Sequence, residues 1–388
     1  MTRKNSDNRQ AELKVRQLHT RKELKQFIDF QWEVYKNDPY WVPPLKFDLL
    51  KSFSPKNNPL LSKGPHAFFM AFRGRHPAGR ILAIYNREVN ESRNNHEGWF
   101  SLFEALDEDR EAAEALFAKV EDWLKEQGAT SMFGPVSPTN GDDNKGVMIE
   151  GFDMQPTLMN SYNHRWVPEF FDSHGFVKAR DLFGYYGDRT LYNPDKYDKV
   201  IEYAMRKYKY RLVRFEFGDV RSLVKDMHEI LVKSSPEWEN YAVPSEEDIM
   251  KEVKSLRSLA DLDLLYMARS TEDNRPIGFL VALPDYNEVL KRLNGRLFPV
   301  GFIKMLYYRK RIKGIRFFIQ FVIPEYQNTG VNVAIMYRCA TAGLKKGYDH
   351  ADGSTIGEEN TKAIHSVEGI GMRKYKTFRY YRKVFAGP

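Results

Sequence analysis

Apolar residues in the first half of the chain follow patterns typical of strands and helices in turn. Short apolar or alternating runs predict strands over residues 13–18, 67–72, 80–86, 98–105, 131–135 and 177–186. Apolar residues at helical spacing predict helices over residues 21–36, 108–127 and 166–174. The expected order is strand, helix, three strands, helix, strand, helix, strand.

The second half repeats this order, with an additional helix. Its strands are expected over residues 210–217, 262–269, 276–283, 316–322, 351–356 and 375–384, and its helices over 220–233, 245–259, 331–346 and 360–368. We interpret the repeat as a duplication and predict an α+β fold in which two tandem domains each hold a mixed central sheet flanked by helices. The expected parts are a polar tail at 1–12, a domain at 13–192 and a domain at 200–388, with the seam in the polar residues 193–199. One continuous large domain is the alternative.

One cysteine and a positive net charge narrow the function classes. Cys339 alone can form neither an internal disulfide nor a cysteine-based metal site, which indicates a reducing compartment. The formal charge of +8 suits an anionic partner: a phosphorylated cofactor, nucleic acid or an acidic membrane surface. Because the chain shows no secretory signal and no apolar run of about 18 residues, we expect a cytoplasmic protein, with peripheral membrane attachment open.

The most specific local motif lies where a predicted strand leads into the long helix at residue 331. Backbone N–H groups at the start of a helix lack internal partners and form an anion site together with the helix dipole. A glycine there lets the backbone approach a pyrophosphate closely. The predicted cofactor-binding residues of this motif are Val322, Gln327, Asn328, Thr329, Gly330, Val331 and Asn332. An ordinary capped helix start is the alternative.

Gln327-x-x-Gly330, the strand before it, and Asn360-x-x-Ala363 on the next helix resemble the acyl-CoA-binding core of the GNAT-type N-acyltransferases. The resemblance implies that the turn cradles the CoA pyrophosphate, that the strand presents an N–H to the thioester carbonyl, and that Asn360 approaches the pantetheine arm. The whole chain resembles a two-domain GNAT-like group that includes bacterial ceramide synthases. The further matching pieces are Asn37-Asp38-Pro39, Gly134-Pro135, Glu150-Gly151-Phe152-Asp153 and Glu358-Glu359-Asn360.

Two positions depart from that family's pattern. Asn332 stands where the family usually has Gly or Ala, and Val367 stands where it often has a tyrosine that protonates the leaving thiolate. Tyr380 and Tyr381 on the closing strand could replace this acid, and Tyr381 is the predicted catalytic residue. A packing role in the core or the substrate wall is the alternative for both.

The reaction also needs a base, because a primary amine with a pKa of about 10 is mostly protonated at neutral pH. Glu358 and Glu359 follow the strand at 351–356. Neighbours on an extended chain point to opposite sides, and we predict that Glu358 faces the site and accepts the proton. A helix cap or a salt bridge is the alternative.

The corresponding junction in the first half, residues 104–111, is acidic and has no glycine. Because it would repel a pyrophosphate, we expect only the second domain to bind CoA. The Gly-, Asn- and Asp-rich residues 134–151 are expected to form a structural loop, and no metal site is predicted. The scattered histidines support no catalytic triad.

Residues 297–316 combine apolar side chains with six cations and contain no acidic residue. This composition is typical of a segment on an anionic membrane surface, although a solvated basic face on a packed helix is the alternative and nucleic acid a less favoured one. We therefore predict an N-acyltransferase that transfers a long-chain acyl group from acyl-CoA to a lipid-like primary amine, such as a sphingoid base. The alternatives are a Fem-like transferase that uses aminoacyl-tRNA on a peptidoglycan precursor and an inactive GNAT-like binding protein.

Overall fold

The helices and strands follow the predicted order, with additions. A computed structural model describes residues 11–386 apart from 108, 140, 142, 192, 235–242 and 258, so most of the predicted tail lies outside the described residues. The strands are β1(Leu13–Leu18), β2(His66–Arg73), β3(His76–Ile84), β4(Glu97–Ala105), β5(Ser131–Gly134), β6(Val147–Glu150), β7(Val177–Asp188), β8(Tyr210–Arg214), β9(Leu265–Ser270), β10(Pro276–Pro284), β11(Gly314–Val322), β12(His350–Gly357) and β13(Arg373–Val384). The helices are α2(Arg21–Asp29), α3(Gln31–Val34), α4(Lys46–Ser52), α5(Pro59–Ser62), α6(Arg87–Arg93), α7(Arg110–Glu126), α8(Trp166–Ser173), α9(Pro194–Lys207), α10(Val220–Ser234), α11(Glu246–Leu256), α12(Asn287–Leu293), α13(Gly301–Arg309), α14(Val331–Lys346) and α15(Thr361–Gly369).

Several elements differ from the sequence-based expectation. The helix expected over 21–36 is divided into α2 and α3 at Phe30. The loop expected over 134–151 contains β6, whose pairing partner β13 lies more than two hundred residues further along the chain. Residues 193–199 were expected to be a linker, but α9 begins there. Asn193 caps this helix by accepting a hydrogen bond from the Lys196 N–H at 3.0 Å, and a proline follows it, which is a helix-start signal.

The chain forms two compact units from segments that are separate in the sequence. Unit 1 takes residues up to Leu182, Val289–Arg309 and Lys376–Pro388, and unit 2 takes Phe183–Glu288 and Lys310–Tyr375. Strands β7 and β13 contribute residues to both. The domain boundaries at 13–192 and 200–388 were inferred from the repeated order of elements in the sequence. These boundaries stay a prediction.

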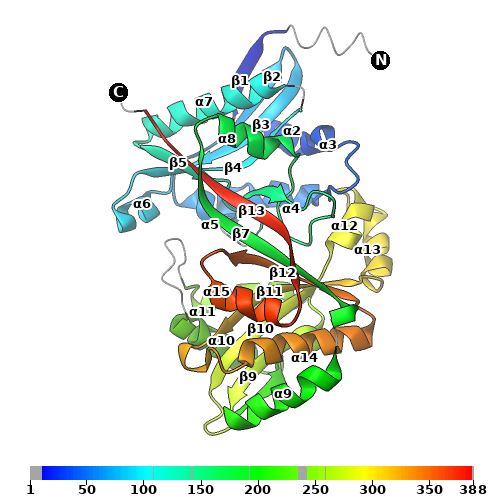
Figure 1. The fold of residues 1–388 in the computed structure, drawn as a ribbon. Helices are drawn as coiled ribbons and strands as arrows, with labels where there is room; N and C mark the ends of the chain where they lie inside the picture. The colour runs from blue at the N-terminus through cyan, green and yellow to red at the C-terminus, as the bar shows by residue number, and fades with distance from the viewer. Residues whose placement is uncertain are drawn as a thin grey trace. The chain divides into compact units, whose positions relative to one another are not determined.

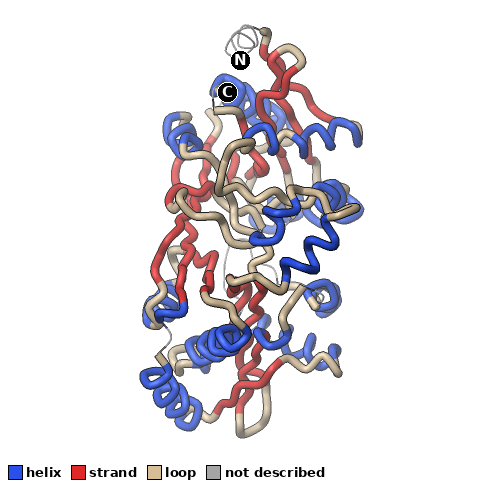
Figure 2. The backbone as a smooth tube through the Cα atoms, turned by 90° about the vertical axis from the view of Figure 1, so that its right-hand side faces the viewer, coloured by secondary structure: helices blue, strands red, loops and turns tan. Residues whose placement is uncertain are grey.

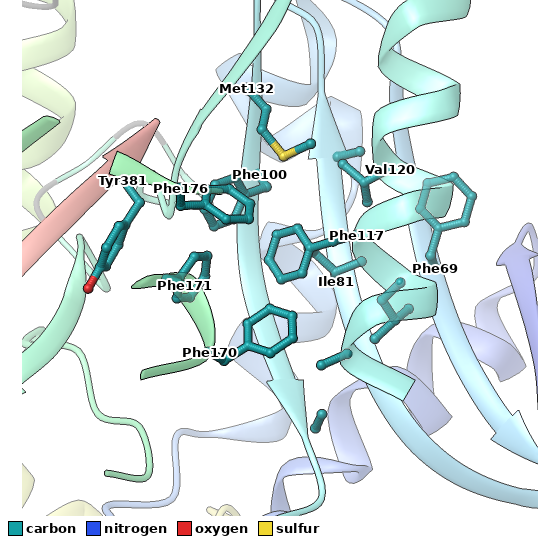
Figure 3. Close-up of a cluster of buried hydrophobic side chains, with 14 of the residues drawn as sticks. Phe69, Ile81, Phe100, Phe117, Val120, Met132, Phe170, Phe171, Phe176 and Tyr381 are labelled. Atoms are coloured by element: carbon teal, nitrogen blue, oxygen red, sulfur yellow. The ribbon is translucent and has the colours of Figure 1, made fainter. Parts of the chain in front are cut away.

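Unit 1 holds a mixed sheet in the order β1-β2-β3-β4-β5-β13, with β6 also paired to β13. Its strands pair antiparallel except β4 with β5. Helix α7 packs against β2 and β3 through buried residues spaced three and four apart, as an amphipathic helix requires. Figure 3 shows the resulting core, in which Phe100, Phe117, Phe171 and Phe176 have ring centroids within 6 Å of one another.

Unit 2 holds strands in the order β7-β12-β11-β10-β9-β8, and β11 pairs parallel with β12. Helices flank these strands, as the blue and red segments of Figure 2 show. Helix α14 packs against β9, β10 and β11, and α9 lies beside it (Figure 1). The buried face of α14 includes Ala334, Ile335 and Cys339. The Cys339 thiol donates to the Leu264 carbonyl at 3.4 Å. Burial raises the pKa of this thiol above its ordinary value, so Cys339 is a packing residue.

Candidate functional site in unit 2

Strands β11 and β12 separate part-way along their length. Their parallel pairing covers only residues 314–316 of β11 and 350–352 of β12, although both strands are fully described and continue to Val322 and Gly357. Residues 318–321 are half-exposed, whereas the rest of β11 is buried. We call residues 317–322 and 353–357 the wedge. Diverging strands leave the N–H and C=O groups of their facing edges available to an extended ligand.

A β-bulge lies at the narrow end of the wedge. On the other side of β11, Val281 of β10 pairs with Ile319 and Ala282 pairs with Phe317, so that Phe318 is an extra residue. A bulge turns backbone groups out of the ladder and often lies beside a site. The Phe318 region can therefore present an N–H that the β10 ladder does not use.

A short turn joins the wide end of the wedge to α14. Asn328 and Gly330 both have positive φ angles, 64° and 83°, and Gly330 is the N-cap of α14 without a side-chain cap. The first helical bond runs from the Ala334 N–H to the Gly330 carbonyl at 2.9 Å, which leaves the N–H groups of residues 331–333 without helical partners. These N–H groups, with the positive end of the helix dipole, form a site suited to an anion.

Hydrogen bonds hold this turn against both of its neighbours. The Gln327 amide donates to the Val322 carbonyl at 3.3 Å, and its oxygen accepts from Lys362 of α15 at 2.8 Å. Gln320 of β11 donates to the Asn332 carbonyl at 3.0 Å. Lys362, which the sequence analysis missed because no motif marks it, therefore places a cation beside the uncapped end of α14.

A buried tyrosine lies behind Gly330. A Cβ atom on Gly330 would lie 3.9 Å from the hydroxyl of Tyr210, and that hydroxyl has no hydrogen-bond partner among the described residues. Burial raises the pKa of Tyr210 to about 12, so the group stays protonated and neutral. A Cβ atom at this position would make only ordinary van der Waals contacts. The positive φ angle is therefore the reason that the position favours glycine.

The segment after β12 brings the predicted base and Asn360 to the same unit. Glu358 is half-buried and Glu359 is exposed, which agrees with the expected alternation. Asn360 is the N-cap of α15: its side-chain oxygen accepts from the Ala363 N–H at 3.1 Å. The helix cap uses the side-chain oxygen of Asn360 and not the amide nitrogen of that side chain.

A buried polar network lies at the narrow end of the wedge. Arg316 and Asp352 are 0% and 1% exposed and lie opposite each other in the parallel pairing. Asp352 accepts hydrogen bonds from the Ser354 N–H at 3.0 Å, from the Ser354 hydroxyl at 2.9 Å and from the Tyr375 hydroxyl. Arg316 donates to the Ser354 carbonyl at 3.2 Å. Buried charges persist only when so surrounded by partners, and this network fixes the point at which the strands part.

Known proteins resemble this chain in sequence and in fold. No family model matches the chain. The chain is 28% identical over 392 aligned residues to the bacterial ceramide synthase of Caulobacter vibrioides, with 97% of this chain and 99% of that protein covered. It is 29% identical to Protein YghO of Escherichia coli, with 95% of each chain covered. Among solved structures, a tandem GNAT protein from the clavulanic acid biosynthesis pathway matches with a TM-score of 0.57 and 11% identity, over 97% of this chain and 99% of that one.

The chain has the fold of the tandem GNAT proteins. The mixed α and β fold and the resemblance predicted from the sequence are thereby confirmed. In this GNAT-like chain, the predicted site residues Val322, Gln327 to Asn332, Glu358 and Asn360 all lie in unit 2. Their roles toward a ligand stay predictions.

Tyr381, the other predicted catalytic residue, lies in unit 1. It is fully buried, its ring stacks on Phe171 with centroids 4.7 Å apart, and its hydroxyl makes no hydrogen bond to a described residue. Burial raises its pKa above the ordinary value of a tyrosine. These surroundings are those of a core residue, which was the alternative interpretation, and its role as an acid stays a prediction.

The strand-to-helix junction of unit 1 differs from that of unit 2. Asp109 caps α7 by accepting from the Ala112 N–H at 3.2 Å, and it also pairs with Arg73 at 2.8 Å. Arg73 contacts Glu111 as well, and Glu104 is buried in an ion pair with Arg80 at 2.7 Å. Asp109 thus occupies an N–H group at the start of α7 that a phosphate would need. Within the described residues, no group of three or more His, Cys, Asp or Glu side chains could hold a metal ion.

Proposed function

We propose that the protein is an N-acyltransferase that takes its acyl group from acyl-CoA and transfers it to a primary amine. The observation that carries the proposal is the combination, within unit 2, of the wedge with the uncapped start of α14. An acyl-CoA has two parts that suit these features: a pyrophosphate for the N–H groups of residues 331–333, and an extended pantetheine arm for the strand edges. Gln327 to Asn332 and Asn360 would hold the cofactor as co-substrate.

In the proposed reaction, the amine nitrogen attacks the thioester carbonyl carbon directly. An N–H in the Phe318 region would stabilise the negative charge that develops on the carbonyl oxygen. Glu358 would accept the proton of the amine, either directly or through a water. The C–S bond then breaks, and CoA leaves as a thiolate that takes up a proton. No covalent intermediate with the protein is required.

Two observations support a long acyl chain and a lipid-like acceptor. The first is the likeness to a bacterial ceramide synthase along almost the whole chain. The second is a group of apolar side chains exposed on unit 1, which we call the apolar patch. It consists of Phe298, Val300, Phe302, Ile303, Leu306 and Tyr307, which lie on or just before α13 and are between 43% and 75% exposed. We propose a sphingoid base as the acceptor class.

The apolar patch also supports attachment to an anionic membrane surface. Exposed cations accompany it at Arg296, Lys304 and Arg309, and no acidic residue occurs between Glu288 and Glu325. Arg316, counted among the cations of residues 297–316, is fully buried and takes no part. No helix among the described residues is long and apolar enough to cross a bilayer. We propose peripheral attachment at the cytoplasmic face through residues 296–310.

Binding of CoA to the purified protein, measured by titration calorimetry, tests the proposal. Gly330→Glu places a bulky negative side chain at the start of α14, and we expect it to weaken CoA binding at least about 100-fold, or about 2.7 kcal/mol. Gly218→Glu is the matched control, because Gly218 has open space around it and an ordinary φ. We expect it to bind CoA as the unaltered protein does.

Turnover then separates the remaining alternatives. Release of CoA from palmitoyl-CoA in the presence of a long-chain amine supports the proposal. Unimpaired CoA binding with no turnover on any of a panel of acyl-CoAs and amines would instead indicate an inactive binding protein. Retention of tRNA by a protein that does not bind CoA would favour the Fem-like transferase.

A further inference from the structure

A second feature of unit 2 is a hollow beneath α14. It lies between that helix, the first residues of β11 and β12, the end of β7 and the residues that follow α15, and its empty volume, including the part open to solvent, is about 620 Å³. Phe317, Met336, Ala340, Leu344, Ile370 and Met372 line it, and the lining is mostly apolar. We propose that this hollow holds the hydrocarbon chain of the acyl group.

The position of Phe317 connects the hollow with the wedge. Phe317 is the first residue of β11 beyond the pairing with β12, and it also lines the hollow. The other lining residues from β11 and β12, which are Ile315, His350 and Ala351, lie in the paired part of these two strands. A ligand that enters the wide end of the wedge and continues in the same direction therefore meets the hollow at the narrow end. The thioester carbonyl would lie between them, beside the bulge at Phe318.

The chemistry of the lining distinguishes a hydrocarbon chain from a polar ligand. Two polar side chains of the lining already have partners: His350 bonds to Asp349 at 2.6 Å, and Tyr348 donates to Asp261 at 3.2 Å. Each methylene that moves from water into apolar surroundings tightens binding about fourfold. The hollow would thus select acyl-CoAs by chain length, because the affinity for acyl-CoA rises with the length of the chain until the space is filled.

Two glycines leave space for side chains that line the hollow. A Cβ atom on Gly187 would lie 2.9 Å from Leu191 and 3.0 Å from Met372, and one on Gly371, which has a φ of 91°, would lie 3.2 Å from Leu191. Larger residues at these places would push Leu191 and Met372, which both line the hollow, from their positions. The size of the hollow therefore depends on small residues at its rim.

This inference rests on the proposed acyl-CoA-dependent function, and the test separates the two. We would measure the affinity of the unaltered protein for CoA, acetyl-CoA, octanoyl-CoA and palmitoyl-CoA. Failure to bind CoA would overturn both proposals. Binding of CoA with equal affinity for all chain lengths would overturn the hollow alone.

Ala340 is a half-buried residue of α14 that lines the hollow, so Ala340→Phe places a ring in this space. We expect it to lower the affinity for palmitoyl-CoA at least about tenfold, while the affinities for CoA and acetyl-CoA stay within about twofold. Ala342→Phe is the matched control, because Ala342 is a half-buried alanine of the same helix that does not line the hollow. Unchanged CoA and acetyl-CoA binding also shows that each variant is folded.

A variant that enlarges the hollow keeps the proposal testable if Ala340→Phe does not fold. Ile370→Ala removes a half-buried side chain from the lining, and we expect the preferred acyl chain to become longer, from palmitoyl towards arachidoyl. If these variants change the preferred length of the amine acceptor while the acyl preference stays unaltered, the hollow holds the acceptor and the proposal is wrong.

Discussion

At the scale of single residues, neighbouring carboxylates of unit 2 have different surroundings and so different expected roles. Asp352 is buried, and Ser354 and Tyr375 donate three hydrogen bonds to it, so a substrate cannot reach its carboxylate. Glu358 is half-buried at the end of β12, next to the helix that Asn360 caps. Only a carboxylate that a substrate can reach can act as a general base, and this favours Glu358.

Glu358→Gln tests this role through its dependence on pH. We expect kcat/KM to fall at least about 100-fold at neutral pH, the usual contribution of a general base. The loss should become smaller as the pH rises towards the pKa of the amine, because the free amine then needs no base. Glu359→Gln, at an exposed neighbouring position, is the control and should retain the activity of the unaltered protein. An equal loss at every pH would contradict the assignment.

At the scale of elements, α7 and α14 occupy corresponding places in the repeat but begin differently. Asp109 caps α7 and binds Arg73, whereas α14 begins at Gly330 with no side-chain cap. Of these two helices, only α14 offers a phosphate its first N–H groups together with the positive end of the helix dipole.

This difference predicts one CoA site per chain. Titration calorimetry with CoA should give a stoichiometry of about one, because a capped and negatively charged helix start repels a phosphate. Asp109→Ala should leave the stoichiometry unchanged, although it removes the cap of α7 and costs about 0.5–2 kcal/mol of stability. Two equivalent sites per chain would show that unit 1 has kept a cofactor site.

At the scale of the whole molecule, the charge of +8 is unevenly placed along the chain. Nine cations and no acid occur in residues 289–324, and the exposed Arg296, Lys304 and Arg309 lie in the segment of unit 1 that carries the apolar patch. Each cation near an anionic membrane surface contributes about 1 kcal/mol, and the attraction is screened by salt. We therefore expect the intact protein to bind vesicles that contain phosphatidylglycerol, but not vesicles of phosphatidylcholine alone.

Vesicle sedimentation checks this prediction. The double variant Ile303→Ser and Leu306→Ser should reduce the bound fraction strongly, because two exposed apolar side chains of α13 lose their place in the headgroup region. The matched control is Val200→Ser with Tyr203→Ser, which removes exposed apolar residues at the same spacing from α9. Equal binding by both variants, or equal binding to both kinds of vesicle, would contradict the role of the apolar patch.

The amino-acid sequence by itself determined those features that depend on residues close together in the chain. Helix α14 was predicted at residues 331–346 as observed, because its apolar spacing and the glycines at either end are local signals. The turn at Gln327 to Gly330 and the acidic start of α7 were recognisable for the same reason. Helix α9 was missed although its signal, Asn193 followed by proline, is also local.

Only the tertiary structure decided features that depend on partners far apart in the chain. Strand β6 exists because β13 pairs with it, and the wedge exists because β12 leaves β11 after Asp352. The tertiary structure also decided that Arg316 is buried while Lys304 is exposed, although both belong to one basic segment. Periodicity reports which side of an element is apolar, but pairing, bulges and hollows depend on what packs against that side.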